Sequence, residues 1–374
     1  MKNPFIFGGV VSGEAFCDRE EELTELLRAA RNGQNVVLHS PRRFGKTSLI
    51  RRALDEAASQ GILTLYVDLY PAVSKQKFLD LYAGALARSL SGGLESVAGT
   101  LRRLLPKLIP KVVIQANGAP TFEFDYDRST PITPHLDDLL EAMQVRAGRA
   151  GVNAVVVFDE FQEIVAYEDD EIERQMRSHF QHHADVSYVF LGSRRYLMRA
   201  LFDNPNRPLY RSARHLPLGP LPAEALRAFI QGRFEQTGFS VASEAIEDLI
   251  RTCQGHPYYT QLLCHLLWDR CIETRTVEAP HVEGALNDAL RREEGVFVTL
   301  WDTLSRKQRQ ALTALSREPA GQVFSAAYLK RHGLGSASSV QKALSALADR
   351  ELIDRTNGDY AIPDLLFRRW IASQ

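Results

Sequence analysis

Short apolar runs alternate with helically spaced apolar positions through the first half of the chain. Near its start, Leu23, Leu26 and Ala30 recur at the spacing of one helix face. Short apolar runs predict strands over residues 35–39, 62–69, 152–158 and 188–191. Because helical patterns separate these strands, the order favours a parallel sheet in an α/β fold.

The alternation of strand and helix patterns becomes less regular between the second and third predicted strands, over about residues 71–136. Helical spacing predicts two helices there, over residues 78–90 and 94–105. Residues 111–126 then predict two short strands with a turn at Asn117-Gly118. We interpret the whole segment as an insertion into the sheet domain.

Strand signals become rare after Pro220. Four helical patterns follow, over about residues 223–237, 243–253, 258–271 and 281–293. From Leu304 onward, three short helices precede a hairpin over residues 352–362 with its turn at Asn357-Gly358, an order typical of a winged helix. The expected domains are a core at 1–218 with an insertion at about 71–136, a helical lid at 219–299 and a winged helix at 300–374.

Composition narrows the class of protein further. The chain has 374 residues, 45% hydrophobic and 24% charged, which suits two or three globular domains. Its 45 basic and 46 acidic residues exclude a surface that coats nucleic acid or membrane throughout, so any such contact must be local. No apolar run is long enough to span a bilayer, and the four cysteines form no CxxC pair. We expect a cytoplasmic protein without membrane contact.

A phosphate-binding pattern follows the first predicted strand and opens a helix. Gly45-Lys46-Thr47 completes the P-loop pattern, in which backbone amides and the lysine hold phosphates and the hydroxyl ligates Mg²⁺. Ser40 replaces the first glycine, so the loop must begin in a conformation available to serine or be somewhat strained. The alternative is a solvated helix start with a surface lysine. The expected nucleotide contacts are Ser40, Pro41, Arg42, Arg43, Phe44, Gly45, Lys46, Thr47 and Ser48.

The third predicted strand ends in two carboxylates, Asp159 and Glu160. Asp159 is expected to hold Mg²⁺ together with Thr47, and Glu160 to polarise the attacking water, with Lys46 holding the phosphates. A strand that simply leaves the core for solvent is the alternative. Together with the loop, however, the acidic strand end predicts a site for ATP or ADP with Mg²⁺.

The fourth predicted strand ends at Ser193, which is expected to orient the water or contact the γ-phosphate. A helix N-cap is its alternative role. Arg194, Arg195, Arg211 and Arg214 are candidates for a catalytic arginine, with Arg211 chosen to face a nucleotide of its own chain or of a neighbour. The others are expected to be solvated or paired. Arg211 therefore raises the expectation of a nucleotide-dependent oligomer.

Several motifs resemble the archaeal-type ATPases of the AAA+/STAND superfamily of P-loop NTPases. They are Phe16-Cys17-Asp18-Arg19-Glu20, the loop through Ser48, Phe158-Asp159-Glu160-Phe161-Gln162, Pro208-Leu209-Tyr210-Arg211, Gly255-His256-Pro257-Tyr258-Tyr259 and residues 360–370. The resemblance implies a RecA-like core with a helical lid and a winged helix. It also implies that Pro257 lies near the nucleotide, although proline is common at the first position of any helix.

The resemblance therefore predicts an ATP-hydrolysing switch, whose lid and winged helix move with the nucleotide state. Hydrolysis is expected to be slow, because Ser40 departs from the loop pattern and the lid offers no assignable sensor arginine. The alternative is a DNA-binding or scaffold protein that uses ATP as a structural ligand. No guanine-reading N-K-x-D motif is found, which disfavours a GTPase.

Duplex DNA or a protein is the expected partner of the winged helix. Residues 300–374 hold eleven basic and seven acidic side chains, but the helix expected to read DNA carries only Lys342 before Arg350. Contacts with phosphates would therefore be few and sensitive to salt. Histidines and cysteines show neither an HExxH motif nor paired cysteines, so no zinc site is expected.

Overall fold

The computed structural model describes residues 2–114, 120–125, 131–318, 322–356 and 359–374. The chain forms two compact units. One contains Arg19–Gly219, and the other combines Met1–Asp18 with Pro220–Gln374. No helix in the described ranges combines the length and apolarity that a membrane crossing requires.

A five-stranded parallel sheet is the centre of the Arg19–Gly219 unit, and it confirms the predicted α/β fold. The strands lie in the order β2-β5-β6-β1-β7. Their bounds are Val36–His39 (β1), Leu63–Asp68 (β2), Ala154–Asp159 (β5), Val186–Gly192 (β6) and Arg214–Pro217 (β7). The pattern of apolar runs missed β7 as a separate strand, because this short edge strand is exposed at both ends.

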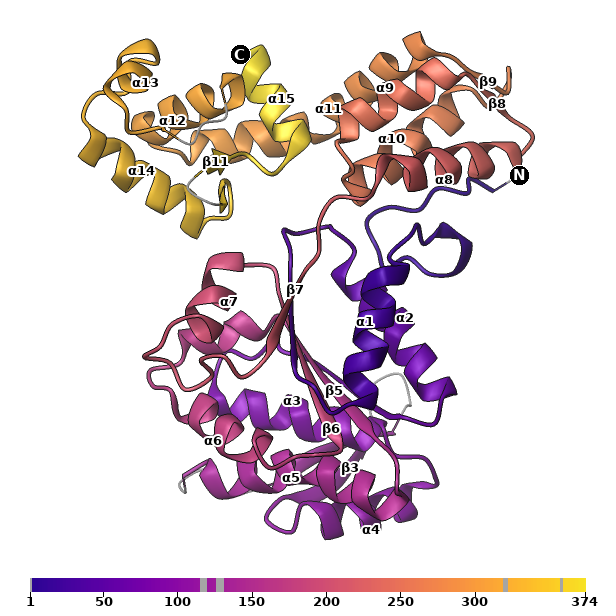
Figure 1. Ribbon diagram of the computed structural model, residues 1–374, viewed down its shortest axis with the longest axis vertical. Coiled ribbons are helices and arrows are strands. Elements are labelled where there is room, and N and C mark those ends of the chain that lie inside the picture. Colours follow the sequence, from indigo (N-terminus) through magenta and orange to yellow (C-terminus); the bar gives the residue numbers. More distant parts are fainter. Residues whose placement is uncertain (1, 115–119, 126–130, 319–321, 357–358) are drawn as a thin grey trace. The chain divides into compact units, whose positions relative to one another are not determined.

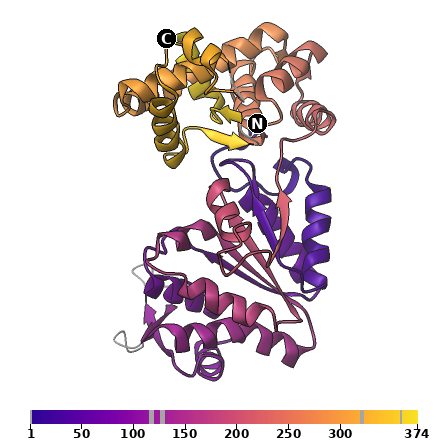
Figure 2. The same ribbon diagram turned by 60° about the vertical axis from the view of Figure 1, so that its left-hand side comes forward.

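Helices cover both faces of the sheet (Figures 1 and 2). Alternate strand residues point to opposite faces, so Val155 and Val157 of β5 pack against α1 and α2. On the other face, Phe158 contacts Phe78 and Tyr82 of α3. The helices of this unit are α1 (Glu20–Arg31), α2 (Lys46–Ser59), α3 (Lys75–Arg88), α4 (Leu94–Leu104), α5 (Thr133–Ala150), α6 (Glu171–Phe180) and α7 (Arg195–Phe202).

The segment between β2 and β5 contains α3, α4 and α5 and a separate antiparallel pair of strands. This pair consists of β3 (Ile109–Ile114) and β4 (Pro120–Asp125), as the sequence predicts. The predicted turn at Asn117-Gly118 lies outside the described residues. Since β2 pairs directly with β5, the segment adds no strand to the main sheet.

Helices dominate the second unit. The first group is α8 (Ala223–Glu235), α9 (Ser243–Cys253), α10 (Pro257–Arg270) and α11 (Ala279–Asp302), with the short strands β8 (Ser240–Val241) and β9 (Thr276–Val277). The second group is α12 (Arg306–Arg317), α13 (Ala326–Arg331), α14 (Ala337–Asp349), β10 (Asp354–Thr356), β11 (Asp359–Ala361) and α15 (Leu365–Ser373). The antiparallel pair β10–β11 follows three helices, and the predicted turn at Asn357-Gly358 lies outside the described residues.

Two features of this unit differ from the expected domain limits. The N-terminal residues pack on the helices, with Phe5 against Phe234, and Gln261 Nε2 donates to the carbonyl of Ala15 (2.8 Å) in the short helix Gly13–Ala15. Helix α11 also continues across the expected boundary at 299/300. Its residue Phe297 packs on Trp370 of α15, so the apolar contacts continue across that boundary.

Gly192, the last residue of β6, is packed too closely to carry a larger side chain. A Cβ there would lie 2.4 Å from Met198 and 2.7 Å from Gln162. We expect Gly192→Ala to lower the free energy of unfolding by about 1–3 kcal/mol, measured by urea denaturation. Gly148→Ala in α5 is the control, because its Cβ would meet nothing within 4 Å and alanine favours helix. Equal stability of the Gly192→Ala variant and the wild type would contradict this packing argument.

Candidate functional site

The predicted phosphate loop connects β1 to α2 at the carboxyl edge of the sheet. Ser40 is fully buried and its backbone is not left-handed. Left-handed backbone occurs instead at Arg43 (φ 64°) and Gly45 (φ 84°). Serine therefore enters the loop without the strain that its replacement of glycine suggested, and the glycine that the loop needs is Gly45.

Lys46 is the first residue of α2 and is only 7% exposed. Its Nζ donates to the carbonyl oxygens of Ser40 (3.0 Å) and Pro41 (3.1 Å). The loop thus wraps around the ammonium group, unlike a lysine that is solvated at a helix surface. Within the loop, Phe44 is half-buried and Arg42 is exposed, while Ser48 is buried in the first turn of α2.

Asp159 ends β5 beside this loop. Its Oδ2 accepts hydrogen bonds from the hydroxyls of Thr47 (3.3 Å) and Tyr66 (2.5 Å), and its Oδ1 accepts from the amide of Glu160 (2.9 Å). Burial raises the pKa of Asp159 above its ordinary value, and the nearby Glu160 carboxylate raises it further, against the opposing hydrogen bond from Tyr66. A nearby cation would stabilise the ionised form of this carboxylate.

Tyr66 on β2 holds the Asp159 carboxylate in place. Burial first, and then the charge of Asp159, raise the pKa of Tyr66, so its hydroxyl stays protonated and donates. The Arg51 guanidinium lies 3.9 Å above the Tyr66 ring. These contacts fix the orientation of Asp159 from a neighbouring strand.

Glu160 follows Asp159 with a left-handed backbone (φ 51°), a conformation that non-glycine residues adopt at a cost. Its Oε2 accepts hydrogen bonds from Ser193 Oγ (3.0 Å) and from Gln162 Nε2 in the short helix Phe161–Ala166. Its Oε1 has no partner among the described residues. Ser193 therefore orients the carboxylate and is not the cap of α7, whose N-cap residue is Arg194.

The donor set of the loop and of Asp159 fits a magnesium nucleotide. Thr47 and Asp159 supply the hard oxygen ligands that Mg²⁺ prefers, and they already lie within hydrogen-bond distance of each other. The Lys46 ammonium lies at the N-terminus of α2, where backbone amides favour an anion. Among the described residues, none beyond the chain neighbours of Gly45 lies within 4 Å of the position that its Cβ would take, which leaves the loop open there.

The candidate arginines are distributed differently from the sequence prediction. Arg214 begins β7 and pairs with Glu25, so it lies at the amino edge of the sheet, away from the loop. Arg211 is exposed, its guanidinium stacks on Tyr210, and its amide donates to Phe202 at the far end of α7 from Ser193. Among the described residues, no contact joins Arg211 to the loop. Its predicted catalytic role within its own chain therefore has no geometric support.

Arg195 lies nearer the phosphate loop. Burial, then the neighbouring His215 and Arg195, lower the pKa of His39 to about 4, which keeps this ring neutral immediately before Ser40. The positive charge of Arg195 therefore acts on the His39 ring at the end of β1. Arg194 is half-buried at the start of α7.

Pro257 begins α10 in the other compact unit. The preceding Gly255 has a left-handed backbone (φ 76°), and a Cβ there would lie 2.7 Å from Leu221 O and from Pro220. This close contact explains the glycine of the Gly255-His256-Pro257 motif by packing within its own unit. The nucleotide contact of Pro257 stays a prediction.

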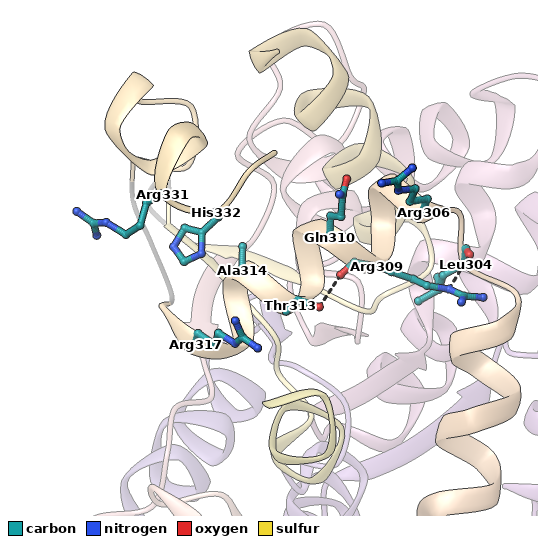
Figure 3. A pocket seen from close by; sticks show the side chains of 9 residues that line it. All are labelled: Leu304, Arg306, Arg309, Gln310, Thr313, Ala314, Arg317, Arg331 and His332. Carbon is teal, nitrogen blue, oxygen red and sulfur yellow. Dashed lines mark hydrogen bonds between the residues drawn. The ribbon is translucent and has the colours of Figure 1, made fainter. Parts of the chain in front are cut away.

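The winged-helix region contains a second candidate site, a cavity of about 600 Å³ along α12 (Figure 3). Arg306 and Arg309 lie in the first turn of α12, Arg317 is its last residue, and Arg331 adds a fourth guanidinium from α13. Arg331 pairs with Glu318 and Arg309 lies near Asp302. Within the described ranges, Arg306 and Arg317 have no hydrogen bond or ion pair. None of the described lining residues is acidic, although Glu318 pairs with both Arg331 and His332, so it is the unpaired Arg306 and Arg317 that favour an anionic ligand.

Two polar residues of the first site were missed from the sequence. Tyr66 lies in an apolar strand, where an aromatic residue predicts only packing, and Gln162 gives no signal separate from the acidic motif before it. The register of β2 on β5, which places Asp68 beside Asp159, could have suggested that β2 contributes to the site. That register is not visible in the sequence.

Sequence comparison identifies two families in the chain. Residues 16–263, more than half of the chain, match the family described as an ATPase domain predominantly from Archaea. Residues 295–373 match the family described as a probable winged helix domain. No curated protein matches the sequence.

Solved structures share the fold at low identity. The Walker-type ATPase paby2304 of Pyrococcus abyssi is 16% identical with a TM-score of 0.65, and the match covers 98% of this chain and 99% of that one. The ORC2 protein of Aeropyrum pernix, solved as ADPNP-ADP complexes, is 14% identical with a TM-score of 0.53, covering 95% and 92%. The ORC1 protein of the same organism, solved with DNA, is 15% identical with a TM-score of 0.50, covering 96% and 93%.

Proposed function

Because this chain belongs to the family of ATPase domains found predominantly in Archaea, we propose that it binds and slowly hydrolyses ATP at the carboxyl edge of its sheet. Its products are ADP and phosphate. The observation that carries the proposal is the Glu160 carboxylate, which two donors hold by Oε2 while Oε1 stays unpaired among the described residues. Such an oriented acceptor suits removal of a proton from water.

The loop and the acidic strand end divide the roles in this reaction. Lys46 and the loop amides bind the phosphates, and Thr47 and Asp159 are the residues that would hold Mg²⁺. The metal supplies charge neutralisation on the phosphate oxygens. Glu160 takes the proton of the attacking water, and Ser193 and Gln162 keep the carboxylate oriented. The ORC2 structure, solved with ADPNP and ADP, supports nucleotides of this type as ligands.

Coupling of the nucleotide state to the rest of the chain is part of the same proposal. An AAA+ type switch would move the helical lid and the winged helix as ATP is bound and hydrolysed. Pro257 would contact the nucleotide from the lid. Exposed Arg211 is better suited to the nucleotide of a second copy than to that of its own chain, which makes the active form a nucleotide-dependent oligomer.

Phosphate release by the purified chain tests the proposal. We expect ATP turnover that requires Mg²⁺ and is slower than the median enzyme rate of about 10 per second. If a second copy contributes Arg211, the turnover per chain should rise with protein concentration. The absence of turnover at any protein concentration, with ATP nevertheless bound, would refute hydrolysis. It would favour the alternative of a scaffold or DNA-binding protein with ATP as a structural ligand.

DNA binding is a second candidate function, and the arginine cavity favours it. The helix expected to enter the major groove, α14, offers Lys342, whereas the guanidinium groups gather along α12. Contacts from α12 would reach phosphates and not base edges, so binding would not depend on sequence. The ORC1 structure with DNA supports duplex DNA as the kind of partner, and a protein with an acidic surface is the alternative.

We expect the double variant Arg306→Ala with Arg317→Ala to weaken duplex DNA binding about 10-fold or more. Affinity falls as salt rises, and each lost phosphate contact should make the slope of log affinity against log salt less steep by about one. Fluorescence anisotropy with a labelled duplex at several salt concentrations measures both effects. The control removes two exposed arginines of α4, Arg102 and Arg103, which changes the net charge equally. Equal losses in the two double variants would refute the cavity as the DNA site.

A further inference from the structure

Four side chains with metal-binding chemistry meet between α5 and the end of α6. Asp137 and Glu141 lie one helical turn apart on α5, and His179 and His183 are four residues apart at the end of α6 and just beyond it. Glu141, His179 and His183 bring their ligand atoms within 4.8 Å of one another. None of the four belongs to the proposed nucleotide site.

The contacts of the two histidines direct one ring nitrogen of each toward Glu141. His179 Nδ1 lies 2.7 Å and His183 Nε2 lies 3.2 Å from Glu141 Oε1. The other nitrogens face Asp137 Oδ1 (2.9 Å) and the Tyr188 hydroxyl (2.7 Å). If these outer partners accept the N–H of each ring, the inner nitrogens carry lone pairs.

Three electron-rich atoms then converge on one point. Lone pairs of two imidazoles and a carboxylate oxygen repel one another unless a positive charge lies among them. His183 is only 6% exposed, so water reaches this ring little and does little to screen the repulsion. A bound cation would supply this positive charge to all three atoms at once.

We propose that Glu141, His179 and His183 bind one divalent transition-metal ion of the zinc class. Two imidazole nitrogens with one carboxylate oxygen form a typical zinc set, whereas Mg²⁺ and Ca²⁺ prefer oxygen ligands throughout. Asp137 and Tyr188 are positioning residues that fix the two rings from outside, as partners of metal-bound histidines commonly do. The Glu141 side chain is 47% exposed, which leaves access for a water as the fourth ligand.

The location separates this site from the nucleotide. His183 precedes the first residue of β6, Val186, whereas Ser193 follows the last, so the two sites lie at opposite ends of that strand. A metal here would join α5 to the end of α6 and stabilise the packing of these helices. The sequence did not predict it, because Glu141 lies about forty residues from the two histidines and the three lack the HExxH or paired-cysteine pattern.

Zinc uptake by the full chain, purified without a polyhistidine tag, tests the proposal. Isothermal titration with ZnCl₂, in excess Mg²⁺ and without nucleotide, should give one equivalent bound to the wild type. His179→Ala and His183→Ala should each lower the affinity at least about 100-fold, and Asp137→Asn about 10- to 100-fold. His182→Ala is the matched control, since this neighbouring histidine is exposed and lies outside the cluster, and it should bind as the wild type does.

The spectrum of bound Co²⁺ identifies the types of ligand, and a further variant controls for misfolding. Co²⁺ should give visible bands of a four-coordinate site without the near-ultraviolet band of thiolate ligands. Because His183→Ala could disturb the core, Glu141→Gln at the exposed ligand must show the same loss with unchanged circular dichroism. No uptake by the wild type, equal uptake by the His179→Ala variant, a thiolate band, or equal loss in the His182→Ala variant would each refute the site.

Discussion

The Glu160→Gln variant is expected to bind ATP with the affinity of the wild type and to hydrolyse it at least about 100-fold more slowly. The amide has nearly the shape of the carboxylate, and its oxygen can still accept from Ser193 and Gln162, so the local structure should persist. An amide cannot take the proton of the attacking water. Single-turnover phosphate release measures the chemical step, and titration with ATP measures binding.

Glu168→Gln is the matched control, because Glu168 is exposed, lies shortly after the acidic motif and changes the net charge in the same way. It should hydrolyse ATP at the wild-type rate. Ser193→Ala removes one of the two donors to Glu160 and should lower kcat by a smaller factor than Glu160→Gln does, with KM unchanged. If the Glu160→Gln variant kept wild-type turnover, the water would have to be activated elsewhere and the role given to Glu160 would be wrong.

The sheet was predictable because its central strands are buried on both faces. Strands β1, β5 and β6 are buried along their whole length, so each forms a continuous apolar run in the sequence. Edge strand β7 does not form a continuous apolar run, because it is only partly buried and pairs with β1 alone. The sequence therefore predicted the core of the sheet better than its edge.

The limits of the domains were harder to predict from the sequence than the helices and strands. No glycine or proline occurs between Val296 in α11 and Leu304 just beyond its end, so no local signal marks where lid contacts give way to winged-helix contacts. The N-terminal segment carries Phe5, whose partners Phe229 and Phe234 lie more than 200 residues away. Pairings at such separation depend on tertiary packing and leave no periodic pattern.

The candidate site was predictable where its residues are consecutive. Lys46 with Thr47, and Asp159 with Glu160, occur as short motifs after strands, and the parallel order brings both to one edge of the sheet. The contacts that orient them come from Tyr66, Gln162 and Ser193, whose roles depend on strand register and side-chain direction. The histidine cluster depends in the same way on how α5 packs against α6.

Lys46→Ala is expected to lower ATP affinity about 100-fold and to abolish measurable turnover at ordinary ATP concentrations. The ammonium group is nearly fully buried inside the loop, where a charge-assisted hydrogen bond contributes about 1.5–3 kcal/mol. Alanine also leaves the carbonyl oxygens of Ser40 and Pro41 without their donor, which should destabilise the empty loop slightly. Titration with ATP and Mg²⁺, beside thermal unfolding without nucleotide, separates the two effects.

Lys77→Ala provides the control, because Lys77 also lies in the first turn of a helix of this unit but is exposed. It removes the same charge and should leave ATP affinity unchanged. Together with Glu160→Gln, the pair of variants divides the site into binding and chemistry, since Lys46→Ala should lose both and Glu160→Gln only turnover. Wild-type ATP affinity in the Lys46→Ala variant would mean that the nucleotide binds away from this loop, and it would refute the proposed site together with its mechanism.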